Sequence, residues 1–124
     1  MKAMVQRSDA SDEFYIQERC HITELSNSED DPAVSIARAR VAPGVSTRWH
    51  RLRQSAERYL ILSGRGRVEM GDLPPQTVSA GDVVRIPPMC RQRITNCDAE
   101  DLVFLAICTP RFFAADYEDL EDPA

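Results

Sequence analysis

The sequence predicts an all-β fold, a sandwich or barrel, in a single domain over residues 1–124. Its apolar segments are short and rich in β-branched and aromatic residues, and turn-forming residues interrupt them about every eight to twelve positions, which is typical of small all-β domains. Helical periodicity is hard to find along the chain. No longer segment repeats, which excludes a solenoid.

The predicted strands are separated by residues with turn chemistry. Residues 14–25 predict one or two edge strands. A Pro-Gly turn at 43–44 and two prolines at 87–88 bound later strands, because proline cannot donate to a sheet ladder. Gly64 and Gly66 separate two strands that we expect to form a hairpin. The remaining strands are expected at 33–41, 48–52, 58–62, 67–70, 76–78, 83–86, 92–95 and 102–108.

The last predicted strand, 102–108, is apolar on both faces. Such a strand needs cover on both sides. One side faces the opposite sheet, and the other requires a further element or a second subunit, so we expect a homodimer. The tail that follows carries Phe112, Phe113 and Tyr117 among acidic residues. This pattern predicts a short helical turn or an arm that packs on the barrel.

The chain is acidic, with twenty acidic and fifteen basic residues and a formal net charge of −5. Proteins that neutralise nucleic-acid phosphates are basic, so no nucleic-acid partner is expected. The longest apolar run has seven residues, whereas a membrane-spanning helix needs about twenty. No secretory leader is expected, and the four cysteines form no CxxC pair. These features favour a cytoplasmic protein with free thiols and no membrane partner.

A histidine and a glutamate lie at a spacing that suits a shared site. His50 precedes Glu57 by seven residues, and such a pair on adjoining strands can converge on one ion. The surrounding segment resembles the cupin superfamily, whose first motif reads G-x5-H-x-H-x(3,4)-E-x6-G. The matching positions are Gly44, His50, Leu52, Glu57 and Gly64.

The second cupin motif, G-x5-P-x-G-x2-H-x3-N, is also similar to a segment of the chain. Its positions fall on Gly81, Pro87, Met89, Gln92 and Asn96, and sixteen residues separate the two motifs. The resemblance covers about residues 44–96. It implies a double-stranded β-helix, or jelly-roll barrel, with a core of about residues 20–110, N-terminal edge strands and a C-terminal tail.

The resemblance also implies a metal site. Metal-binding cupins use two histidines and a glutamate of the first motif and the histidine of the second, but this chain has Leu52 and Gln92 at two of these positions. One divalent ion (Fe, Mn, Ni or Zn) held by His50, Glu57 and Gln92 is therefore implied. In the alternative, His50 and Glu57 hydrogen-bond each other, Gln92 completes the polar network and Leu52 covers it.

Strand alternation extends the predicted pocket. Tyr59 shares a face with Glu57, and Cys90 shares one with Gln92. The Tyr59 hydroxyl is a candidate catalytic proton donor or substrate anchor, with a core tyrosine as the alternative. Cys90 is either a pocket thiol or a small buried hydrophobe. Together with Leu52, these residues outline a substrate pocket.

Arginines form the last group of candidates. Arg38 and Arg40 share one face of the strand before the first motif. Pointing inward, they would bind a carboxylate or phosphate in the substrate pocket. Pointing outward, they form a solvated face, which is favoured because an unpaired guanidinium is costly to bury. Near the motifs, the arginines at 48, 51, 53, 91 and 93 either ring the mouth of the pocket or pair with carboxylates.

Two functions are consistent with these residues. The resemblance implies a metal-dependent enzyme that acts on a small oxygen-rich or carboxylated molecule by isomerase-, dioxygenase- or decarboxylase-like chemistry. The alternative is a metal-free cupin that binds or senses a small molecule without catalysis. Retention of His50 and Glu57 favours the first function and Leu52 favours the second. The fold does not choose between them, because one barrel supports many activities.

Overall fold

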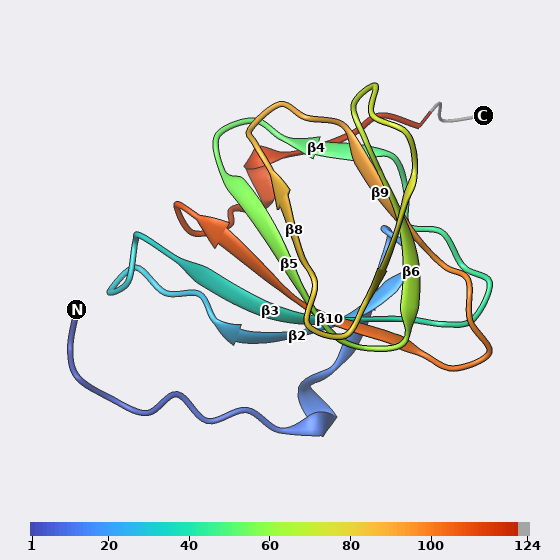
Figure 1. Ribbon diagram of the computed structural model, residues 1–124. Coiled ribbons are helices and arrows are strands. Elements are labelled where there is room, and N and C mark those ends of the chain that lie inside the picture. The colour runs from blue at the N-terminus through green and yellow to red at the C-terminus, as the bar shows by residue number, and fades with distance from the viewer. Residues whose placement is uncertain (122–124) are drawn as a thin grey trace.

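Two facing antiparallel sheets make up the computed structural model, which describes residues 1–121 (Figure 1). Within these residues, six strands form one sheet in the order β1-β2-β3-β10-β5-β8, and five form the other in the order β11-β4-β9-β6-β7. The predicted all-β jelly-roll class is confirmed. The elements are η1 (Ala10–Asp12), β1 (Phe14–Ile16), β2 (Cys20–Ser26), β3 (Ser35–Val41), β4 (His50–Leu52), β5 (Ala56–Ser63), β6 (Arg65–Met70), β7 (Gln76–Ser79), β8 (Val83–Ile86), β9 (Gln92–Asn96), β10 (Leu102–Thr109), η2 (Ala114–Asp116) and β11 (Tyr117–Asp119).

The strands begin and end close to where the turn residues predicted. No helix within residues 1–121 is long and apolar enough to cross a membrane. The apolar side chains of alternate strand positions meet between the two sheets and form one core. Its buried members are Cys20, Ala39, Val41, Tyr59, Ile61, Val68, Val78, Val84, Ile86, Ile94, Leu102 and Phe104.

The hairpin predicted across Gly64 and Gly66 is wrong. β5 pairs with β10 and β8 in one sheet, whereas β6 pairs with β9 and β7 in the other, so the chain crosses between sheets after Ser63. Gly64 has φ of +84°, and a Cβ there would lie 2.6 Å from the carbonyl oxygen of Asp101. This glycine therefore permits a tight crossing beside the start of β10 rather than a hairpin turn.

β10 lies in the middle of the six-stranded sheet, between β3 and β5. Phe104 and Cys108 line the interior of the barrel. Because strand side chains alternate between faces, the neighbouring Leu105 faces outward. The strand register places Leu105 between Arg38 of β3 and Leu60 of β5, and its side chain is half-buried. The outer side of β10 is thus covered in part by its own sheet. The homodimer stays a prediction.

The tail after β10 forms an arm on the barrel, as predicted. β11 pairs with β4, so that Tyr117 lies opposite Leu52. The buried carboxylate of Asp116 accepts hydrogen bonds from the backbone nitrogens of Gln54 at 2.7 Å and Ser55 at 3.1 Å. These bonds attach the arm to the loop that follows β4. Residues 122–124 of the predicted 1–124 domain lie outside the described residues.

A non-glycine residue occupies the glycine position of the second motif. Met89 has φ of +69°, which lies in the left-handed region that favours glycine. Its backbone nitrogen donates to the carbonyl oxygen of Leu52 at 2.7 Å. This hydrogen bond to the end of β4 requires the left-handed backbone conformation at position 89. The conformation is therefore present even though the residue is methionine rather than glycine.

Candidate functional site

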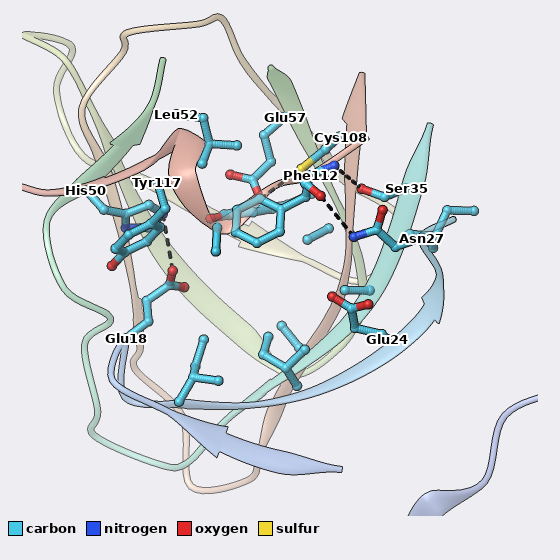
Figure 2. A pocket seen from close by; sticks show the side chains of 18 of the residues that line it. Glu18, Glu24, Asn27, Ser35, His50, Leu52, Glu57, Cys108, Phe112 and Tyr117 are labelled. Carbon is cyan, nitrogen blue, oxygen red and sulfur yellow. Dashed lines mark hydrogen bonds and ion pairs between the residues drawn. The ribbon is translucent and has the colours of Figure 1, made fainter. Parts of the chain in front are cut away.

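A cavity of about 320 Å³ lies inside the barrel, and most of its wall is apolar. Both ends of the chain contribute to it, since β1 forms one part of the wall and the arm of η2 and β11 forms another (Figure 2). This volume is at the small end of the range for ligand sites, about 300–1,000 Å³. The polar side chains of the wall are Gln17, Glu18, Glu24, Asn27, Ser35, His50, Glu57, Tyr59, Cys108 and Tyr117.

His50, on β4, is buried, and its ring has three neighbours that fix its orientation. Its Nδ1 lies 2.7 Å from the carbonyl oxygen of Arg48, so Nδ1 carries the proton and donates it. In the neutral ring Nε2 is then the acceptor. Nε2 lies 3.5 Å from Oε1 of Glu18 (Figure 2). The ring of Tyr117 stacks on the imidazole, with centroids 5.1 Å apart. The ring is thus oriented to accept a proton at Nε2.

A chain of hydrogen bonds links the two sheets beside the cavity. The Tyr59 hydroxyl donates to Oε1 of Gln92 at 2.6 Å, and Nε2 of Gln92 donates to Oε1 of Glu57 at 3.0 Å. The second oxygen of Glu57 lies 3.8 Å from the thiol of Cys108. Gln92 is opposite His50 in the pairing of β4 with β9. Its carboxamide is therefore engaged at both of its polar atoms.

The buried position of Glu57 changes its acidity. Burial raises the pKa of Glu57 to about 7, against the opposing effects of a charge on His50 and the Gln92 hydrogen bond. Burial also raises the pKa of Tyr59 well above its ordinary value. Glu57 is therefore poised to exchange a proton near neutral pH, whereas Tyr59 stays neutral and is a poor acid.

The side chains predicted as metal ligands lie together but do not form a donor set that suits the implied ion. Gln92 uses its carbonyl oxygen to accept from Tyr59, and Leu52 has no donor atom. Among residues 1–121, no three His, Cys, Asp or Glu side chains converge to hold a metal ion. His50 is the one imidazole in the described cavity wall. Transition-metal sites ordinarily need more nitrogen, sulfur or carboxylate ligands.

The predicted placement of Arg38 and Arg40 in the pocket needs correction. Ala37 and Ala39 of β3 line the cavity, so the arginines that alternate with them lie on the outer face. Arg40 donates to both carboxylate oxygens of Glu13, at 2.6 and 3.1 Å, and Arg38 lies 3.6 Å from the same carboxylate. The outward alternative is the one observed, because Glu13 supplies the counter-charge there.

Of the other two residues predicted for the substrate pocket, one lines the cavity and one does not. Leu52 lines the cavity as predicted. Cys90 does not, because it lies in the turn before β9, where strand alternation has not begun. It is half-buried and packs against the core, and its thiol lies 3.6 Å from the carbonyl oxygen of Arg91. The motif-flanking arginines pair with carboxylates rather than ringing the cavity: Arg48 with Asp119, Arg51 and Arg53 with Glu118, Arg91 with Asp72 and Arg93 with Glu69.

Sequence reasoning missed several residues of the cavity wall. Glu18 and Glu24 come from the β1–β2 hairpin, outside both motifs. A signal existed for Glu24, because it follows the buried Cys20 and the half-buried Ile22 on the same face of β2. Glu18 lies in the turn and carries no such signal. Tyr117 was expected only as a packing residue of the arm.

Sequence comparison identifies the type of domain. Residues 37–108 match the sequence profile of the cupin domain. An uncharacterized protein of Methanocaldococcus jannaschii is 36% identical over 87 residues, which are 70% of this chain and 69% of that protein. Both matches extend over more than half of the chain.

Solved structures share the fold at low sequence identity. The Streptomyces protein Pac13, described as a nucleoside dehydratase, is 18% identical with a TM-score of 0.75, covering 100% of this chain and 93% of Pac13. KdgF of Halomonas sp. is 14% identical with a TM-score of 0.72, covering 82% and 87%. Oxalate decarboxylase of Lactobacillus farciminis is 20% identical with a TM-score of 0.75, covering 87% and 33%.

Proposed function

The chain belongs to the cupin family, and from this premise we propose that it is a small-molecule enzyme whose reaction is a proton transfer, of the isomerase or lyase type, at the barrel cavity. One observation carries the proposal. Nε2 of His50 and the carboxyl group of Glu57 border the same largely apolar cavity, so a bound molecule meets a proton acceptor and a proton donor together.

His50 is the proposed base. The Arg48 carbonyl fixes the proton on Nδ1 and leaves Nε2 free to accept one from the substrate. The carboxylate of Glu18, 3.5 Å from Nε2, then stabilises the imidazolium that forms. The stacked ring of Tyr117 holds the imidazole in place during this step.

Glu57 is the proposed acid. With a pKa of about 7, it carries a proton in a large fraction of molecules at neutral pH. In an elimination, His50 would take a proton from carbon while Glu57 protonates the departing hydroxyl, which leaves as water. In an isomerisation, Glu57 would instead protonate the substrate oxygen as the carbon loses its proton. Tyr59 acts through Gln92 as a positioning residue for Glu57.

The composition of the site supports this class over the other two that the sequence suggested. The dioxygenase-like chemistry that the resemblance implied uses a divalent ion, and the donor set around His50 does not suit one. A decarboxylase binds a carboxylate, but no arginine or lysine borders the cavity among the described residues. The dehydratase Pac13 has a similar barrel, which is compatible with elimination chemistry in this fold.

The proposal is tested by proton exchange with solvent. Small hydroxylated aldehydes and ketones, with and without an amino group, are incubated with the protein in D₂O, and ¹H NMR follows loss of carbon-bound protons and release of alkene products. We expect at least one compound to exchange or eliminate, and His50→Gln and Glu57→Gln each to reduce that rate by about 10²-fold or more. Glu100→Gln, an exposed change of the same kind, serves as the matched control.

The contrary outcome separates an enzyme from a binding protein. Compounds that shift the NMR signals of cavity residues but never exchange or eliminate would indicate the metal-free binding function. A rate that is unchanged in both His50→Gln and Glu57→Gln would also contradict the proposal, because the chemistry would then not depend on the cavity pair.

A further inference from the structure

The charge of the cavity wall limits what the cavity can hold. Three carboxylates border it, those of Glu18, Glu24 and Glu57, together with the imidazole of His50. The described part of the wall contains no arginine or lysine. An anionic ligand would therefore meet carboxylates with one imidazole to offset them.

The arginines nearest to the motifs do not compensate for these carboxylates. They are paired on the outer faces of the sheets, as Arg40 is with Glu13 and Arg51 with Glu118. Glu24 has no ion-pair or hydrogen-bond partner for its side chain among residues 1–121, and it is exposed at the cavity. Figure 2 shows the carboxylates of Glu18, Glu24 and Glu57 directed into the same space from different sides.

Glu57 is the third carboxyl group of the wall, and its side chain is more than nine-tenths buried. Nε2 of Gln92 donates to one of its oxygens at 3.0 Å, and the thiol of Cys108 donates to the other at 3.8 Å. Because both oxygens already have protein partners, Glu57 adds negative charge to the cavity when it is ionised but offers no free acceptor.

The remaining wall suits an organic ligand. The aromatic rings of Phe14, Phe112 and Tyr117 border the cavity with several aliphatic side chains. Aromatic faces attract cations and also pack against apolar groups. The volume of about 320 Å³ restricts the ligand to a small molecule.

We infer that the substrate of this cavity is a small organic amine, held as an ammonium ion by the negative charge that Glu18 and Glu24 give to the wall, with its apolar part against the aromatic side chains. The inference rests on the proposed function for the identity of the site and names its substrate class. It replaces the carboxylated substrate that the sequence suggested. The amine donates hydrogen bonds to carboxylate oxygens, which are acceptors only.

The test compares three probes that share one ring and differ in a single polar group: benzylamine, benzyl alcohol and benzoate. ¹⁵N-edited NMR titrations follow the backbone amides of cavity residues, and each probe is added up to its solubility limit at neutral pH. We expect benzylamine to bind at least about tenfold more tightly than benzoate, with benzyl alcohol between them. Glu18→Gln and Glu24→Gln should each reduce this ratio, and the distant exposed change Glu100→Gln should leave it unchanged.

Several results would overturn the inference. Benzoate binding as tightly as benzylamine would do so, as would a ratio that Glu18→Gln and Glu24→Gln leave intact, or the absence of benzylamine shifts at cavity amides. Because this experiment measures binding without turnover, its result is independent of the exchange assay. A preference for the amine without any exchange would contradict the proposed reaction and leave the ligand class standing.

Discussion

The ring of Tyr117 stacks on the imidazole of His50, with centroids 5.1 Å apart and planes inclined by 20°. The two residues are far apart in the sequence and lie on the paired strands β11 and β4. The C-terminal arm therefore forms part of the site and supports the proposed base directly.

Removal of this ring should lower the stability of the fold. Tyr117→Ala is expected to lower the free energy of unfolding by about 1–2 kcal/mol, since it removes an aromatic pair and part of the cavity wall. Tyr117→Phe keeps the ring and should stay within about 0.5 kcal/mol of the parent protein. Urea denaturation measures the free energy of unfolding of both variants. Equal losses in the two variants would show that the hydroxyl, rather than the ring, is what matters.

The acidity of Glu57 predicts a pH dependence of stability. Its pKa rises from 4.5 to about 7 on folding, so between these values the folded state holds a proton that the unfolded state has released. The contribution of Glu57 to stability is therefore greatest below about pH 4.5 and falls as the pH rises to about 7. Glu57→Gln should gain stability relative to the parent over this interval, by on the order of 3 kcal/mol.

The measurement is urea denaturation of both proteins at several pH values. Glu100→Gln, which changes an exposed carboxylate, should show no such gain. A constant difference between Glu57→Gln and the parent from pH 4.5 to pH 7 would contradict the raised pKa.

Metal removal should have little effect. Because Gln92 is engaged by Tyr59 and Glu57, dialysis against EDTA is expected to leave the melting temperature and any exchange activity unchanged. Mass spectrometry of the purified, untagged protein measures the metal content. Near-stoichiometric metal that is lost in His50→Ala and Glu57→Ala would instead support the metal site implied by the family motifs.

Two glycines with similar backbone angles should respond differently to alanine. Gly64 has φ of +84°, and a Cβ added there would lie 2.6 Å from the carbonyl oxygen of Asp101. Gly44 has φ of +76°, and a Cβ added there would have no atom within 4 Å. Gly44→Ala should cost about 1–2 kcal/mol for the left-handed conformation alone. Gly64→Ala should cost clearly more, because the backbone must also move. Equal losses in thermal denaturation would contradict the close crossing of β5 to β6.

The predicted homodimer can be examined through the outer side of β10. Light scattering after gel filtration should give twice the chain mass of 14.0 kDa. Leu105→Glu places a charge on the half-buried outer face between Arg38 and Leu60, and we expect it to give the monomer mass. Leu73→Glu, at an exposed loop position, is the control. A parent mass of 14.0 kDa would contradict the prediction.

Much of the fold followed from the sequence, because period-two alternation and turn residues are local properties of a chain. They located the strands around His50 and Gln92 and predicted the packing arm that carries Tyr117. The two motif spacings also placed His50, Glu57 and Gln92 near one another. The sheet crossing at Gly64 was not predicted, since a glycine turn looks the same whether the next strand pairs with its neighbour or joins the opposite sheet.

The character of the site was decided by tertiary structure. Alternation separates two faces of a strand but does not say which one is inside, so the outward position of Arg38 and Arg40 depended on Glu13 lying across the sheet. Glu18 reaches His50 only because β1 and β2 close one side of the barrel. By itself the sequence determined which strands form and which residues the motifs bring together. The charge and shape of the cavity come from residues distant in the chain, which only strand pairing and sheet packing bring into contact.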